Sequence, residues 1–298
     1  MSAHPASATS VPAPRAGIRL PGLSTGLGRG LVVLYLSILV LLPLAALTNQ
    51  SLSDGLSTFW DQVTTEQALR SLELTLVASA IVVVINAFFG TILAWLLVRD
   101  DFPGKSVINA VIDLPFALPT IVASLILLEL WGARSPFGID IAATQASIVV
   151  ALCFVTLPFV VRAVQPLLME MDREMEEAAA SLGAGGFTVF RRIIFPNLLP
   201  GLGAGIALAF ARALGEFGSV LLFAGGLPDT TVSSVYIRNQ IESGNDTGAA
   251  AVSVVLLLAS LLCLVLVGLI QRWAGRHERP APEVDTTIMP FAGGGGAG

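Results

Sequence analysis

Two charged residues stand four positions apart, Arg212 and Glu216, within the otherwise apolar stretch of residues 198–222. On a helix this spacing brings both side chains to one face, where they can pair. Inside a membrane each charge would cost about 2.5–3.5 kcal/mol, so both should face the interior of a helix bundle. The pair then either fixes the rotation of its helix or makes Arg212 the counter-charge for an anion in a low-dielectric pathway.

A second group of chemically informative residues lies in the polar stretch 167–199. Asp172 is placed to cap a helix that opens with acidic residues, and Gly183 is placed to end it. A second short helix should follow, and Pro196 is expected to stop it. One face of the first helix carries a narrow apolar stripe at helical spacing, formed by Met175, Ala178, Ala179 and Leu182. The sequence thus predicts a helical hairpin that either packs on its own bundle or docks on a partner.

The elements around these residues are strongly apolar. Hydrophobic residues make up 54% of the 298 residues and charged residues 12%, roughly half the charged share of a soluble domain. Six apolar runs each approach the ~20 residues with which a helix crosses a membrane. They cover residues 31–47, 74–97, 107–131, 146–166, 198–222 and 249–270. We expect an all-α integral membrane protein with six transmembrane helices in residues 29–275, and disordered tails at 1–28 and 276–298.

The basic residues predict which side of the membrane each loop faces, because cytoplasmic loops are enriched in Lys and Arg. With the N-terminus inside, twelve of the 16 fall in inside segments, Arg162 among them, and three fall outside. Both termini and the hairpin between helices 4 and 5 are therefore expected in the cytoplasm. Asp113 and Glu129, in the third run, are poor anion ligands, and we expect them at an interface or in a water-filled cavity.

The hairpin resembles a known motif. Glu177-Ala178-Ala179, three residues, Gly183, nine residues and then Ile193-Ile194-Phe195-Pro196 is similar to the EAA motif of binding-protein-dependent ABC transporter permeases, with Phe195 where Leu is usual. The stretch 212–218 is similar to the fifth span of the sulfate and molybdate branch, and the resemblance covers about residues 25–275. In that family the hairpin is the coupling helix that seats in a groove of the ATPase subunit. The resemblance implies this role for Glu177, Ala178, Ala179 and Gly183.

The resemblance also implies a function and a set of partners. The chain would be a permease subunit in the cell (inner) membrane, forming half of the pathway of an ATP-driven importer for sulfate and thiosulfate. Its partners would be a second homologous permease subunit, two ATPase subunits and an extracytoplasmic sulfate-binding protein. ATP and Mg would bind the ATPase subunits, so this chain would hold no cofactor and would not itself be an enzyme. Arg212 and Glu216 would belong to the anion pathway or its gate.

Three alternatives remain at this stage. A molybdate or tungstate permease would carry an anion of the same tetrahedral, dianionic shape. A secondary transporter would need no ATPase. A membrane enzyme would need catalytic carboxylates or histidines clustered near one interface, whereas His4 and His277 both fall in the polar tails and Cys153 and Cys263 lie in apolar runs.

Overall fold

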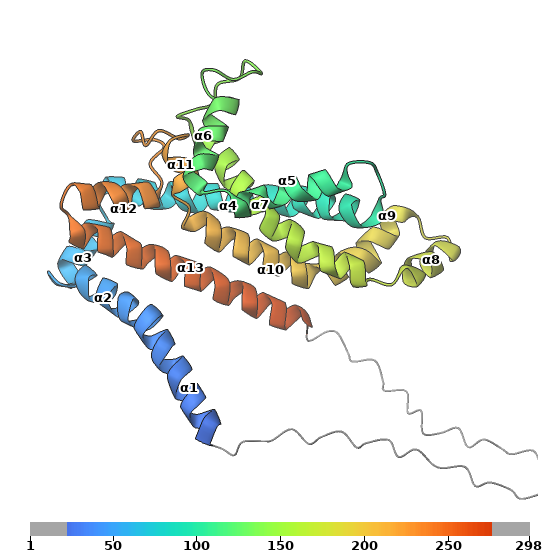
Figure 1. Cartoon of the computed structure of the whole chain (residues 1–298), viewed down its shortest axis with the longest axis horizontal. Coiled ribbons are helices and arrows are strands. Elements are labelled where there is room, and N and C mark those ends of the chain that lie inside the picture. The colour runs from blue at the N-terminus through green and yellow to red at the C-terminus, as the bar shows by residue number, and fades with distance from the viewer. Residues whose placement is uncertain (1–22, 276–298) are drawn as a thin grey trace, which may run out of the picture. The chain divides into compact units, whose positions relative to one another are not determined.

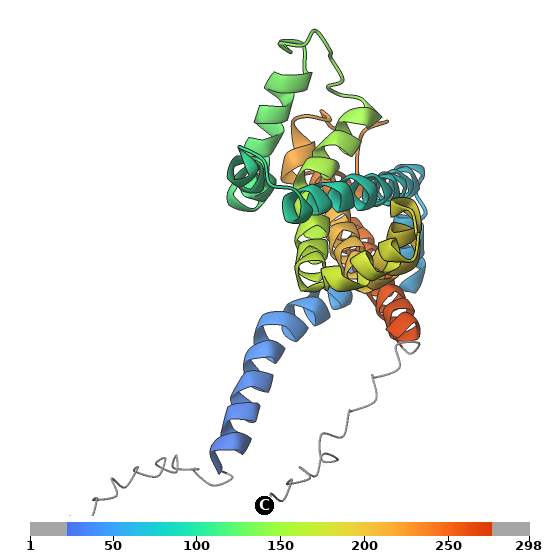
Figure 2. The same cartoon turned by 90° about the vertical axis from the view of Figure 1, so that its right-hand side faces the viewer.

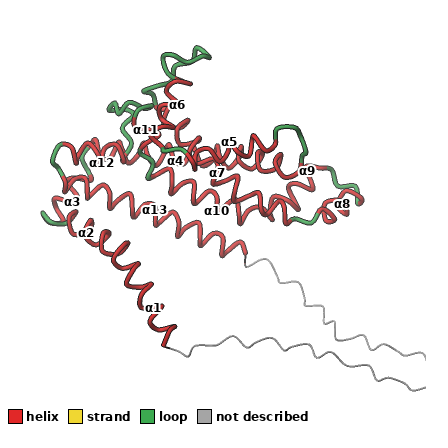
Figure 3. Tube along the Cα trace, in the orientation of Figure 1, coloured by secondary structure: helices red, strands yellow, loops and turns green. Residues whose placement is uncertain are grey.

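The computed structural model describes residues 23–275, with side chains for residues 26–269, and every regular element in that range is a helix (Figure 3). Its contacts divide the chain into two units, residues 1–49 and 50–298, which we describe separately. Of the two predicted tails, residues 1–22 and 276–298 lie outside the described residues. Residues 23–28 were expected in the first tail, but they form the beginning of a helix.

The first unit is one apolar helical stretch. Helix α1 (Leu23–Leu36) runs through the π-helical turn η1 (Ser37–Leu41) into α2 (Leu42–Ser51). Residues Gly26–Ser51 are long and apolar enough to cross a membrane. The π turn ends two residues before Pro43, which has no N–H to continue an α-helical hydrogen-bond ladder, and a π turn is one way to absorb that loss.

The second unit contains the other helices, shown in Figure 1. In chain order they are α3 (Leu56–Val63), α4 (Glu66–Arg99), α5 (Lys105–Ala117), α6 (Thr120–Trp131), α7 (Gln145–Glu170), α8 (Arg173–Ser181), α9 (Gly186–Val189), η2 (Phe190–Ile194), α10 (Phe195–Leu214), α11 (Gly218–Leu221), α12 (Ser233–Glu242) and α13 (Asp246–Gly275). Helices α4 and α10 both pack on α7, and α13 packs on α10. Helices α3 and α12 lie at one end of this bundle and α8 and α9 at the other (Figure 1).

Small residues allow the long helices to approach closely. A Cβ atom at Gly205 of α10 would lie 2.9 Å from the Ala163 Cβ and 3.0 Å from the Val160 Cα of α7. A Cβ atom at Gly90 of α4 would lie 2.9 Å from a Val160 methyl group. Since lipid gives apolar side chains no advantage in packing on one another, such close contacts and interhelical hydrogen bonds hold membrane helices together. The Asn86 amide supplies one of these bonds, donating to the Thr156 hydroxyl at 2.8 Å.

The third apolar run is not one continuous helix. It divides into α5 and α6, of 13 and 12 residues, because the backbone is extended at Leu118 and Pro119. Helix α6 turns away from the direction of α5 in Figures 1 and 2. Each half is shorter than the ~20 residues of a straight crossing. The described residues accordingly contain five helices long and apolar enough to span a membrane.

The fifth run differs from the prediction at both ends. Pro196 does not stop the hairpin's second helix, because α9, η2 and α10 form one continuous helix over Gly186–Leu214. Proline is tolerated in a first helical turn, and here, as at Pro43, a π turn precedes it. At the other end α10 stops at Leu214, so Glu216 lies in the non-helical link before α11.

Candidate functional site

The hairpin begins as its sequence predicts. The Asp172 carboxylate accepts a hydrogen bond from the Glu174 N–H at 2.9 Å and so caps α8. Glu174 and Glu176 lie in the first turn, where the helix dipole favours negative charge.

The end of α8 explains why Gly183 belongs to the motif. Gly183 has a φ of +85°, a conformation in which other L-residues are strained. Its N–H donates to the Ala180 carbonyl at 2.9 Å, and the Ala184 N–H donates to the Ala179 carbonyl at 3.1 Å. These two bonds form the Schellman arrangement, which satisfies carbonyls at a helix end. Gly183 therefore sets where α8 ends and how the chain turns toward α9.

Residues of the EAA motif divide between two faces of α8. Glu177 and Ala178 are exposed, whereas Ala179 is half-buried and packs against the bundle core. The exposed apolar side chains beside them are large: Leu182 is 90% exposed and Phe187, in α9, is 76% exposed. The hairpin thus presents an apolar surface that no described residue of the chain covers.

A contact that the sequence analysis missed ties α8 to the bundle. Arg99, the last residue of α4, forms an ion pair with Glu176 of α8. Arg99 also lies over the Trp95 ring, with its guanidinium carbon 5.6 Å from the ring centroid. The partners are 77 positions apart, and no spacing pattern in the sequence connects them.

Arg212 and Glu216 do pair, as predicted, with 2.5 Å between an Arg212 terminal nitrogen and Glu216 Oε2. The Glu216 side chain is only 1% exposed. Its Oε1 accepts from the Ser219 N–H at 2.9 Å, and its carbonyl accepts from the Ser234 hydroxyl at 2.6 Å. Glu216 therefore holds the Arg212 guanidinium in place and also accepts a hydrogen bond from the first turn of α11.

The Arg212 guanidinium keeps unused donors. Its side chain is 35% exposed, and among the described residues its one ion-pair or hydrogen-bond partner is Glu216. An arginine carries five N–H donors. This side chain can therefore stay bound to Glu216 and still donate to a second anion.

The assignment of Arg162 to the cytoplasmic loops is wrong. This residue lies within α7, which continues through Pro166 to Glu170. The guanidinium donates to both Asp113 carboxylate oxygens, at 2.8 and 2.5 Å, and to the Gln165 side-chain oxygen at 2.5 Å. It also donates to the side-chain and backbone oxygens of Asn109, at 3.1 and 3.2 Å. All five of its donors have acceptors, so Arg162 holds α5 against α7 and has none left for a ligand.

The other acidic residue of the third run lies elsewhere. Glu129 pairs with Arg134 at 3.2 Å, and both side chains are well exposed. Within the described residues no three His, Cys, Asp or Glu side chains gather as a metal site would require.

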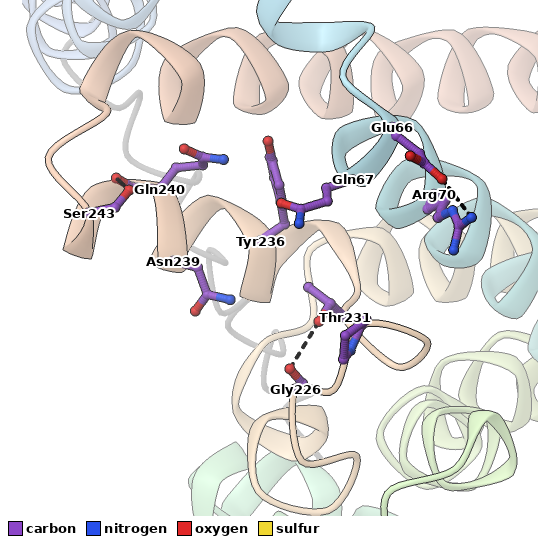
Figure 4. Close-up of a pocket in the computed structure, with 10 residues that line it drawn as sticks. Glu66, Gln67, Arg70, Gly226, Thr231, Tyr236, Asn239, Gln240 and Ser243 are labelled. Atoms are coloured by element: carbon purple, nitrogen blue, oxygen red, sulfur yellow. Dashed lines mark hydrogen bonds and ion pairs between the residues drawn. The ribbon is translucent and has the colours of Figure 1, made fainter.

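A polar cavity of about 480 Å³ lies at the end of the bundle opposite the hairpin, between the start of α4 and α12 (Figure 4). Its cation, Arg70, pairs with Glu66 at 2.7 Å, and the neighbouring lining side chains from α12 include Asn239 and Gln240. Both side chains of this pair are well exposed, at 63% and 78%, so water screens the Arg70 charge more than that of Arg212, whose side chain is 35% exposed.

This architecture defines a multi-pass helical membrane protein that carries a helical hairpin between two of its long helices. Residues 86–279 match the model of the family described as "binding-protein-dependent transport system inner membrane component". The chain belongs to this family and is a transport subunit.

Two relatives are similar to this chain in sequence, and a solved structure is similar to it in fold. The chain is 42% identical over 253 residues to the "sulfate transport system permease protein CysT" of Synechocystis sp., covering 82% of this chain and 88% of the relative. It is 40% identical to the protein of the same name from Salmonella typhimurium, covering 87% and 95%. A subunit of a bacterial alginate ABC transporter shares the fold, with a TM-score of 0.70 and 16% identity over 84% of this chain and 94% of that one.

Proposed function

We propose that this chain is the permease subunit that forms half of the membrane pathway for sulfate and thiosulfate in an ATP-driven importer. The observation that carries the substrate is the similarity to sulfate transport permeases, at about 40% identity over more than four fifths of this chain. The anion-capable site is Arg212, which is held in the apolar bundle by Glu216 and has donors to spare.

In this proposal the chain crosses the membrane six times with both termini in the cytoplasm. The five long helices supply five crossings, and α5 with α6 supplies the sixth as a broken helix. Broken helices are tolerated in membranes where protein or water covers the freed backbone groups. The transmembrane domain begins with α1 and extends to residue 275, and it includes the coupling loop at residues 167–199. Residues 1–22 and 276–298 lie on the cytoplasmic side.

The proposed partners are a second, homologous permease subunit, two ATPase subunits and an extracytoplasmic sulfate-binding protein. The exposed apolar surface of the hairpin docks in a groove of an ATPase subunit, with Glu177 and Ala178 at the contact and Ala179 and Gly183 shaping it. ATP and Mg bind the ATPase subunits. Closure of the ATPase dimer moves the hairpin, and this movement shifts the bundle between inward-open and outward-open states. The anion can shift the equilibrium between these two states only if it binds one of them more tightly than the other.

The substrate is tested by uptake of labelled sulfate into a strain that lacks this gene and carries it on a plasmid. We expect uptake that thiosulfate inhibits and that molybdate inhibits weakly. Equal or stronger inhibition by molybdate would assign the chain to the molybdate and tungstate alternative instead.

The role of Arg212 is tested by R212A, which should assemble normally but lower sulfate uptake at least tenfold, since the pathway loses its counter-charge. Arg238 is a matched control, because it forms an equivalent pair with Glu242 four residues on, at 2.6 Å, in exposed surroundings. R238A should keep normal uptake. If R212A also transports normally, Arg212 has only a structural role.

Docking is tested by affinity purification of the chain in detergent, which should bring an ATPase subunit with it. A178W places a large ring on the exposed face and should abolish co-purification, whereas A178S should retain it. A bulky residue at Ala179 or Gly183 should act indirectly, by displacing α8 or straining its end. Normal sulfate uptake without any associated ATPase would favour a secondary transporter.

A further inference from the structure

Helix α8 has few contacts with the rest of its unit. None of its residues is fully buried. A hollow of about 360 Å³ lies beside it, lined by Glu176, Glu177 and Ala180 on one side and by Trp95 and Phe190 on the other. The connection between α8 and the bundle therefore depends on a small number of specific side chains.

The Arg99–Glu176 pair is the main one. The Arg99 side chain is 9% exposed and the Glu176 side chain 22% exposed, so water screens this pair much less than it screens a surface pair. Among the residues described by the structure, it is the one ion pair or side-chain hydrogen bond that joins α8 to a long helix of the bundle.

An aromatic stack continues this connection toward the other half of the hairpin. The Trp95 ring, below Arg99, meets the Phe190 ring of η2 edge to face at 5.9 Å between centroids. The Phe190 ring in turn lies 6.0 Å from that of Phe195, at the start of α10. Such cation–π and edge-to-face contacts have defined geometries and so restrict relative movement.

The chain's own connectivity explains why this contact matters. The backbone joins α8 directly to α7 through Met171-Asp172 and to α10 through the turn at Gly183 and η2. Neither connection leads to α4. A movement imposed on α8 by a partner would reach α7 and α10 through the backbone, and α4 indirectly because α4 packs on both of these helices. Glu176, Arg99 and Trp95 add a direct side-chain connection from α8 to α4.

We infer that Arg99 and Glu176 are positioning residues that couple movement of the hairpin to α4 during transport. This inference rests on the proposed function, because it assumes that an ATPase moves the hairpin. It adds a residue outside the EAA motif, Arg99, and assigns to Glu176 a role different from that of its neighbour Glu177, which is exposed.

The test is the number of sulfate ions transported per ATP hydrolysed by the complete complex in proteoliposomes. R99Q and E176Q should still bind the ATPase, since the docking face is intact, but should lower this ratio about tenfold. The charge-reversed double variant R99E/E176R should recover at least half of the wild-type ratio, because it restores the pair. R70Q and E66Q are matched controls, because they remove an exposed pair from the other end of α4, and both should keep the wild-type ratio.

Two results would overturn the inference: a wild-type ratio in both R99Q and E176Q, or a double variant no better than the single ones. Should R99Q fail to assemble, E176Q decides the matter, because Glu176 lies on the hairpin and is not part of the bundle core. A wild-type complex that does not couple ATP hydrolysis to sulfate uptake would instead contradict the proposed function itself.

Discussion

Arg162 and Arg212 carry the same guanidinium group, but their surroundings give them different roles. Arg162 donates all its hydrogen bonds to three side chains and one backbone oxygen, whereas Arg212 uses one nitrogen on Glu216. A saturated arginine joins helices, and an unsaturated one can also bind an anion. The distinction depends on neighbours from distant parts of the sequence, so a spacing rule that detects Arg212–Glu216 cannot detect Arg162–Asp113.

The joining role of Arg162 predicts coupling between its substitution and that of Asp113. R162M and D113L should each lower the free energy of unfolding by about 1–2 kcal/mol, since each leaves a partly buried partner unpaired. The double variant should lose less than the sum, with a coupling energy of about 1 kcal/mol, because solvent screens a pair whose side chains are 33% and 48% exposed. Denaturation of the purified chain in detergent measures this, and strictly additive effects would contradict the joining role.

Gly183 gives a second prediction at this scale. G183A forces an L-residue into a φ of +85° and should destabilise the end of α8 by about 1 kcal/mol. That loss should weaken binding of the ATPase subunit about fivefold, measured by titration in detergent. Gly185 is the matched control: it lies in the same turn, has a φ of −68° and has open space around it. G185A should bind normally, and equal loss in both variants would mean that the turn tolerates no side chain at all.

The apolar runs of the sequence predicted where the long helices lie better than the prolines predicted where those helices end. The sequence located each long apolar helix, the cap at Asp172 and the end at Gly183. It could not decide what each proline does: the helix breaks at Pro119, continues through Pro158 and Pro166, and absorbs Pro196 with a π turn. The outcome depends on whether neighbouring groups satisfy the backbone carbonyls that a proline leaves free, and that is a property of the packed bundle.

The contact between α7 and α10 makes a prediction at the scale of elements. G205V introduces a branched side chain where even a Cβ atom would lie 2.9 Å from Ala163, and should destabilise the chain by about 2 kcal/mol through overpacking. G268V makes the same substitution in α13, where nothing lies within 4 Å, and should cost much less. Thermal unfolding in one detergent compares them, and similar losses would mean that helix propensity, and not packing, causes the effect.

At the scale of the whole molecule, the proposal depends on which end of the bundle faces the cytoplasm. Removing Arg162 from the inside set leaves eleven basic residues on the predicted cytoplasmic side against three outside, which still favours a cytoplasmic hairpin. The hairpin and α12 lie at opposite ends of the second unit (Figure 1). One pair of labels can therefore test the orientation of the whole bundle.

Exposed serines at the two ends provide the label positions, Ser181 in α8 and Ser243 after α12. Both native cysteines, Cys153 and Cys263, are first replaced by alanine. A membrane-impermeant maleimide should then label S243C in intact cells in which the reagent can reach the outer face of the membrane that holds the protein. It should label S181C only after the membrane is permeabilised, because the hairpin must face the ATPase. Labelling of S181C from outside, with protection of S243C, would mean that the bundle has the opposite orientation. The hairpin could then not contact any protein that hydrolyses ATP in the cytoplasm.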